Sequence, residues 1–114
     1  MRGEIGDVAR MHHIVEACNE ILQYTLESTI QEFETDSMMR FACIKQLEII
    51  GEAANHVSDD TKSKFTNIEW RQIVGMRNVF VHEYFGIDHS LVWDIIQTDI
   101  PPLQSKVEQI LLEL

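Results

Sequence analysis

Cysteine, proline and glycine are all scarce in this sequence. There are 2 cysteines, 2 prolines and 5 glycines among 114 residues. Two cysteines are too few for the disulfide framework of a small secreted protein, which favours a reducing compartment. So few turn-forming residues also leave little material for the many tight turns of a β-sandwich or barrel. The composition therefore favours an all-helical, cytoplasmic protein.

Long apolar runs and basic residues are lacking as well. No stretch approaches the roughly 18 apolar residues of a membrane-spanning helix, and the first residues lack the apolar region of a signal peptide. We therefore expect no association with a membrane. The chain has only 9 Lys and Arg but 19 Asp and Glu, which gives a net charge of −10. Because nucleic-acid binders normally carry a basic surface, any chemistry on RNA must work against this charge.

The residues that are present indicate one globular domain over residues 1–114. Hydrophobic residues make up 45% and charged residues 25% of the chain, as in ordinary globular proteins. Apolar residues recur every three or four positions over most of the sequence, which is the period of amphipathic helices. This pattern predicts an up-down bundle of four main helices.

Polar residues and prolines mark the expected helix ends. The expected N-caps of the four helices are, in chain order, Asp7, Asp36, Asn67 and Asp88. Pro101 and Pro102 fit poorly in a helix interior, so we expect the last helix to be kinked or broken there. Thr98 or Asp99 is the expected cap of its restart.

Gly51 lies inside the second predicted helix. A glycine there lowers the stability of the helix by about 1 kcal/mol relative to alanine. This loss is offset where another backbone packs so close against the helix that no larger residue would fit. Gly51 is therefore a candidate for such a close approach.

The stretch 71–85 is the richest in chemically useful side chains. Arg77 offers a permanent cation for phosphate oxygens, and His82 is suited to proton transfer near neutral pH. Asn78 adds a donor and an acceptor beside Arg77. In one straight helix Arg77 and Tyr84 share a face, whereas His82 lies about 140° from Arg77. Convergence of Arg77 and His82 then needs a frayed helix end or a second copy of the segment across a two-fold axis. The structural alternative is a surface ion pair for Arg77 and an ordinary histidine at 82.

Other candidate sites have less support. His12 and His13 with Glu16, or Glu52 with His56, are spaced like metal ligands, but exposed helix faces often carry such pairs. Glu48 and Glu52, one helical turn apart, are typical of a solvated face. The sequence also contains no glycine-rich nucleotide-binding motif and no cysteine–histidine pair suited to catalysis. We expect neither a metal nor a cofactor.

The residues from Arg77 to Tyr84 have the form R-x4-H-x-Y. This form is similar to the signature of the HepT branch of the HEPN-domain family. The blocks at residues 47–54, 70–78, 92–96 and 99–103 also look like that family's sequence. The resemblance covers nearly the whole chain, apart from residues 29–37 and the extreme N-terminus.

The resemblance implies a helical bundle that forms a homodimer and acts as a metal-independent endoribonuclease toxin. It implies that Arg77 and His82 are the catalytic pair, with Asn78 assisting. It also implies a partner, an antitoxin of the MNT nucleotidyltransferase type, which silences the toxin by attaching AMP to Tyr84. A second hypothesis is a non-catalytic HEPN module that binds nucleotide or a protein partner. Growth arrest that depends on His82 would distinguish the two.

Overall fold

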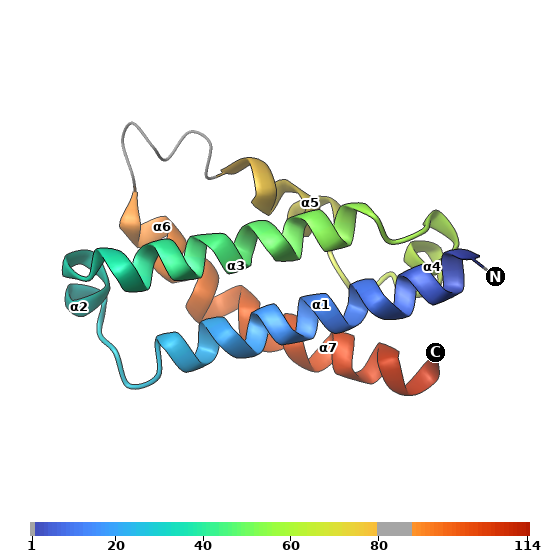
Figure 1. Ribbon diagram of the computed structural model, residues 1–114, viewed down its shortest axis with the longest axis horizontal. Helices are drawn as coiled ribbons and strands as arrows, with labels where there is room; N and C mark the ends of the chain where they lie inside the picture. Colours follow the sequence, from blue (N-terminus) through green and yellow to red (C-terminus); the bar gives the residue numbers. More distant parts are fainter. Residues whose placement is uncertain (1, 80–87) are drawn as a thin grey trace.

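The computed structural model describes residues 2–79 and 88–114, and this part of the chain is helical with no strand (Figure 1). The helices are α1 (Arg2–Tyr24), α2 (Ile30–Thr35), α3 (Ser37–Asn55), α4 (Asp59–Lys64), α5 (Trp70–Val79), α6 (His89–Asp94) and α7 (Ile100–Glu113), with a π-helical turn at Ile95–Asp99 between α6 and α7. Among the helices described, none is long and apolar enough to cross a membrane.

The longer helices run alternately up and down, which confirms the predicted helical bundle. α1 and α3 lie side by side in opposite directions, α5 packs against α3, and α7 packs against α1 (Figure 1). The short helices α2 and α4 join α1 to α3 and α3 to α5. This order places α5, which carries Arg77, on the outer side of α3.

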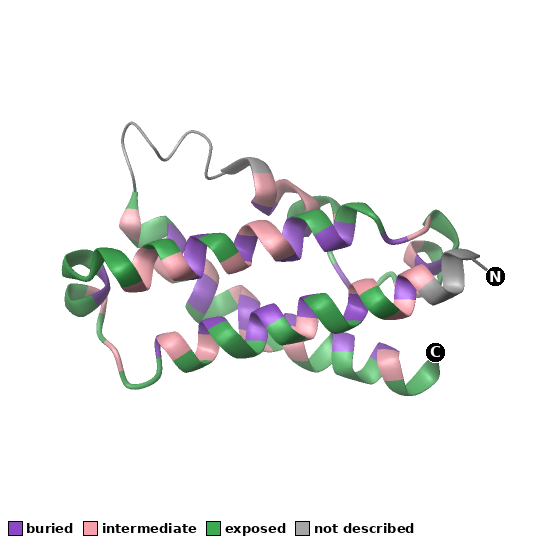
Figure 2. Ribbon diagram, viewed as in Figure 1, coloured by how far each residue is buried: buried purple, intermediate pink, exposed green. Residues whose placement is uncertain are grey.

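The core lies between the apolar faces of the long helices, as Figure 2 shows for α1 and α3. On α3 the buried stripe follows the predicted three-and-four spacing closely. On α1 it is rotated slightly from the predicted seam, since Val15 and Leu22 are only half-buried. The fully or almost fully buried side chains of the three longest helices include Met11, Ile14, Cys18, Ile21, Cys43, Leu47, Ile50, Ala54, Val107 and Ile110.

The connection between α1 and α3 is built from two helix caps. Thr29 and Glu32 form a capping box at the start of α2. Phe33 is fully buried, and its ring centroid lies 5.2 Å from that of Trp93 near the end of α6. Asp36 accepts a hydrogen bond from the Met39 amide and begins α3, which confirms the predicted cap. The short helix α2 thus covers one end of the core.

Asp7 does not cap the first helix, and that prediction is wrong. α1 already begins at Arg2, and Asp7 is 2% exposed. Its carboxylate accepts hydrogen bonds from the Ser58 amide at 2.9 Å, from the Ser58 hydroxyl at 2.6 Å and from the Thr61 hydroxyl. Burial acts to raise the pKa of Asp7, but these hydrogen bonds outweigh it and lower the pKa below its ordinary value. Asp7 therefore serves as a buried anion that ties α1 to the start of α4.

The predicted cap at Asn67 is also wrong, whereas the one at Asp88 is confirmed. α5 begins at Trp70, and the Asn67 carbonyl instead accepts a hydrogen bond from Lys106 Nζ at 3.0 Å. The Asp88 carboxylate accepts from the Leu91 amide at 3.1 Å and begins α6. Asn67 lies too far before Trp70 to occupy the N-cap position, which is the residue directly before the first helical residue.

The irregularity expected at Pro101–Pro102 takes the form of a π turn directly before the prolines. The Ile100 amide bonds to the Ile95 carbonyl, so the chain stays helical from α6 into α7. Asp99 occupies the expected N-cap position and the prolines lie in the first turn of α7, as predicted, but the Asp99 side chain caps no amide. The Thr98 hydroxyl donates instead to the Asp94 carbonyl at 2.6 Å. The wider turn accommodates two residues that have no amide hydrogen to donate.

Candidate functional site

Arg77 is positioned by an unusually close contact between α5 and α3. A Cβ atom built on Gly51 would lie 2.6 Å from the Arg77 amide nitrogen and 3.0 Å from its Cβ. Only glycine leaves room for this approach, because backbone atoms cannot move aside as a flexible side chain can. The contact explains why a helix-destabilising residue stands in the middle of α3. It confirms the close approach expected at Gly51.

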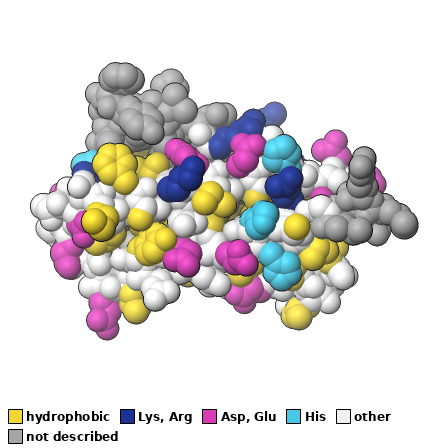
Figure 3. Space-filling model, in the orientation of Figure 1, with side chains coloured by type: hydrophobic (Ala, Val, Ile, Leu, Met, Phe, Trp, Pro, Cys, Tyr) yellow, Lys and Arg dark blue, Asp and Glu magenta, His cyan; other side chains and the backbone are white. Residues whose placement is uncertain are grey.

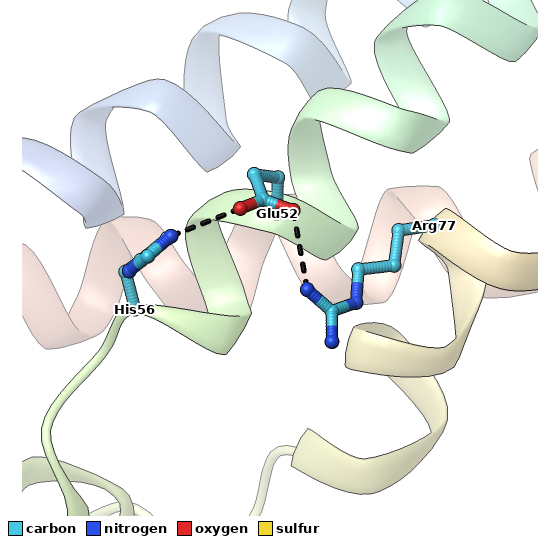
Figure 4. A network of polar contacts seen from close by, with 3 residues as sticks. All are labelled: Glu52, His56 and Arg77. Atoms are coloured by element: carbon cyan, nitrogen blue, oxygen red, sulfur yellow. Dashed lines mark hydrogen bonds and ion pairs between the residues drawn. The ribbon is translucent and has the colours of Figure 1, made fainter.

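The Arg77 guanidinium belongs to a short polar network with Glu52 and His56, shown in Figure 4. Arg77 Nη1 donates to Glu52 Oε2 over 3.3 Å, and the other carboxylate oxygen, Oε1, lies 2.9 Å from His56 Nε2. Glu52 and His56 are one helical turn apart at the end of α3. One carboxylate therefore bridges the arginine of α5 and the histidine that ends α3.

The bridging carboxylate is held in its ionised form. The hydrogen bond with His56 is the main cause that lowers the pKa of Glu52, and the hydrogen bond from Arg77 is the next. Both partners favour the charged carboxylate over the protonated acid. Arg77 accordingly faces a full negative charge at neutral pH.

Part of the Arg77 side chain lies inside the protein while its tip reaches the surface. Nε is buried and has no hydrogen-bond partner among the described residues, although 34% of the side chain as a whole is exposed. In Figure 4 the second terminal nitrogen, Nη2, points away from Glu52. The guanidinium is thus held along one edge and keeps donors for a further acceptor.

Arg77 opens onto a groove of about 450 Å³ between α3 and α5. Among the described residues, those that line it are Lys45, Glu48, Ile49, Glu52 and Arg77. Lys45 forms an exposed ion pair with Glu48 at 3.8 Å, and Glu48 has no bond to Arg77. Figure 3 shows basic, acidic and histidine side chains interspersed on this face of the molecule. The mixed charges on this face therefore indicate a local cationic site and not a broad basic patch.

The structure places one of the four predicted site residues in full. Arg77 sits in the last turn of α5, and the backbone of Asn78 continues that helix to Val79. The side chain of Asn78 and the whole of His82 and Tyr84 lie outside the described residues. The arrangement of the catalytic pair therefore stays a prediction.

Sequence reasoning missed the role of Glu52 and His56. Their spacing suggested only a surface pair or, less favoured, metal ligands, and Glu52 with Glu48 suggested a solvated face. Glu52 is indeed exposed, with 55% of its side chain open to solvent, but its two carboxylate oxygens also contact His56 and Arg77. The described residues contain no group of three metal-ligating side chains. The available signal was Gly51, because the residue after a close helix contact is well placed to meet the side chains of the neighbouring helix.

Both cysteines lie in the core and away from this network. Burial raises the pKa of the Cys18 and Cys43 thiols to about 12. Thiols of such high pKa are poor nucleophiles and metal ligands, because the reactive form is the thiolate. The two cysteines act as small apolar core residues.

The comparison with known proteins identifies the family. Residues 14–110 match the family described as "HepT-like: Ribonuclease HepT-like". This match covers most of the chain, and the chain belongs to the HepT-like ribonuclease family. No solved structure matches the chain with statistical significance.

Several relatives match over nearly their full length. A Methanocaldococcus jannaschii protein named "Putative RNase MJ1380" is 40% identical over 100 residues, which cover 88% of this chain and 92% of the relative. A Thermococcus cleftensis protein named "Probable ribonuclease HepT" is 37% identical over 100 residues, covering 88% and 91%. A Caldanaerobacter subterraneus protein named "Putative RNase TTE0752" is 32% identical over 101 residues, covering 89% and 90%.

Proposed function

We propose that this protein is a metal-independent endoribonuclease in which Arg77 and His82 form the catalytic pair and Asn78 assists. The observation that carries the proposal is the placement of Arg77. Its backbone is fixed against Gly51, while its guanidinium is presented at an open groove. Family membership and the R-x4-H-x-Y sequence from Arg77 to Tyr84 support the assignment of His82 as its partner.

The proposed reaction uses the RNA's own 2′-hydroxyl as the nucleophile. Its oxygen attacks the adjacent phosphorus, the bond from phosphorus to the 5′-oxygen breaks, and a 2′,3′-cyclic phosphate remains. His82 takes the proton from the 2′-hydroxyl and returns a proton to the departing 5′-oxygen. The Arg77 guanidinium stabilises the negative charge that builds up on the phosphoryl oxygens. Every step is supplied by side chains of this protein and by the RNA itself.

The proposal includes a homodimer that brings two Arg77–Tyr84 segments together. Helical geometry supports it, because Arg77 and His82 point about 140° apart in a continuous helix. Arg77 lies inside α5, which is helical through Val79, so the direction of its side chain is set by that helix. A second copy across a two-fold axis would let the arginine of one protomer meet the histidine of its partner.

We predict that RNA cleavage by the purified protein persists in excess EDTA. The reason is that proton transfer and charge stabilisation are assigned to His82 and Arg77, so no metal-bound water is needed. The measurement is the rate of cleavage of a labelled RNA with and without chelator, with detection of the cyclic phosphate end. Loss of activity in EDTA would contradict the mechanism. No cleavage by the intact, folded dimer, together with nucleotide or protein binding, would favour the non-catalytic HEPN module.

The proposal also assigns the protein to a toxin–antitoxin pair whose antitoxin is an MNT-type nucleotidyltransferase. In this pair the Tyr84 hydroxyl attacks the α-phosphorus of ATP, pyrophosphate leaves, and AMP stays attached to Tyr84. In a straight helix that continued to residue 84, Tyr84 would share a face with Arg77, so the added phosphodiester would carry a negative charge close to Arg77. It would therefore occupy the cation that the RNA phosphate needs.

Co-expression with the nucleotidyltransferase is expected to add the mass of one or more AMP groups to the chain. The Tyr84→Phe variant should lack this addition, because it has no hydroxyl, and should stay toxic unless the partner also neutralises it by tight binding. Intact mass spectrometry and growth assays measure the two effects. AMP found on another residue, or retained in Tyr84→Phe, would refute the assignment.

A further inference from the structure

Glu52 stands in an unexpected place for a ribonuclease that must bind a phosphate through Arg77. Its carboxylate contacts the same guanidinium that the RNA phosphate would approach, and it carries the same sign of charge as the phosphate. Two roles are conceivable. Glu52 either competes with the phosphate for Arg77 or holds Arg77 in the orientation that the phosphate requires.

The geometry of the network favours the second role. Glu52 accepts from Nη1 only, over 3.3 Å, so it leaves Nη2 uncovered. A competitor that imitates a phosphate would cover both terminal nitrogens in a two-pronged pair, which is the arrangement that Arg and carboxylates favour. The observed one-sided contact instead fixes the rotation of the guanidinium plane and leaves its other edge open.

The second carboxylate oxygen explains why this orientation is stable. Oε1 lies 2.9 Å from His56 Nε2, on the side of Glu52 away from Arg77. An exposed glutamate with a single long contact would sample several rotamers, because its side-chain entropy opposes one fixed position. Contacts at both oxygens restrict it, and the backbone of His56 is held by its amide hydrogen bonds to the Ala53 and Ala54 carbonyls at the end of α3.

We propose that Glu52 is a positioning residue for Arg77 and that His56 acts on Arg77 through Glu52. The proposal rests on the assignment of Arg77 to phosphate binding. Gly51 fixes the Arg77 backbone, and Glu52, the next residue in sequence, fixes the tip of its side chain. Two consecutive residues of α3 thus determine both ends of the arginine.

The test compares Glu52→Ala, Glu52→Gln and the matched control Glu20→Gln. Glu20 is an exposed glutamate of α1 that loses the same charge and does not line the groove. We expect Glu52→Ala to lower kcat about tenfold with KM changed less than about twofold, because misorientation of a catalytic group lowers the rate more than binding. Glu52→Gln keeps an oxygen that accepts from Nη1, so it should recover about a third of the parent rate. Glu20→Gln should stay within about twofold of the parent.

A double-mutant cycle tests the role of His56. His56→Ala should lower kcat about threefold in the parent protein and have no further effect in Glu52→Ala, because its action passes through Glu52. A readout independent of activity is the ¹⁵N relaxation of the Arg77 Nε–Hε group. Glu52→Ala should increase the mobility of that group, whereas Glu20→Gln should leave it unchanged.

Two results would overturn the proposal. If Glu52→Ala raises kcat/KM, Glu52 competes with RNA. If Glu52→Ala matches Glu20→Gln in rate and in Arg77 mobility, the contact has no role. Failure of the underlying function looks different. In that case Arg77→Ala itself would cleave RNA at the parent rate, whereas failure of the positioning role alone leaves Arg77→Ala inactive and Glu52→Ala fully active.

Discussion

Alanine at position 77 or 82 is expected to lower the rate of RNA cleavage by about 10²- to 10³-fold. Removal of one donor that stabilises transition-state charge typically has an effect of this size, and loss of a proton-transfer group has a similar one. Since the two residues act on the same transition state, the double variant should be little worse than either single variant. Expression of either variant without the partner should no longer arrest growth.

Matched controls separate this effect from a general loss of positive charge. Arg71 is an exposed arginine of the same helix, α5, and His13 is an exposed histidine of α1. Arg71→Ala and His13→Ala should cleave RNA within a few-fold of the parent, and circular dichroism should show that all four variants are folded. Cleavage by His82→Ala at the parent rate would remove histidine from the mechanism.

Gly51→Ala is expected to lower the free energy of unfolding by about 1–3 kcal/mol, although alanine is the better helix former. The added methyl group would lie 2.6 Å from the Arg77 amide nitrogen, so α3 and α5 must separate. That movement also displaces Arg77, and the remaining folded protein should cleave RNA more slowly. Urea denaturation and cleavage rates measure the two consequences.

Gly75 provides the control for this substitution. It lies in α5, two residues before Arg77, and a Cβ built there meets no atom of the described residues within 4 Å beyond the helix's own backbone. Gly75→Ala should therefore raise stability by up to about 1 kcal/mol, because only the helix propensity changes. A Gly51→Ala protein as stable as Gly75→Ala would show that the two helices are not in close contact in solution.

The helices could be predicted because the sequence signals that define them lie close together in the chain. The spacing of apolar residues identifies the helices, and Asp36 and Asp88 cap the helices that follow them, as their sequence positions indicate. The prediction for Asp7 failed because distant partners bind its carboxylate. Asp7 has the sequence features of a cap for its own helix, but it binds Ser58, 51 residues away.

The candidate site was predictable only in part, for the same reason. The R-x4-H-x-Y pattern identifies Arg77 as a residue of interest, since its chemistry is visible in the sequence. The contact between Arg77 and Glu52 joins residues 25 positions apart and depends on how α5 crosses α3. Helical periodicity determines which face each residue occupies but not where two helices touch.

The π turn at Ile95–Asp99 lets two consecutive prolines follow a helix without a break in its path. A π turn is an α-helical turn that contains one surplus residue. Deleting one residue there would leave a regular α-helical turn, so Leu103, Val107 and Ile110 would still face the core, where they are now buried. The cost would fall instead on Pro101 and Pro102, because in a regular helix interior a proline ring clashes with the carbonyl four residues earlier. The surplus residue thus separates the hydrogen bonding of α6 from the first turn of α7 while both keep the same helical phase.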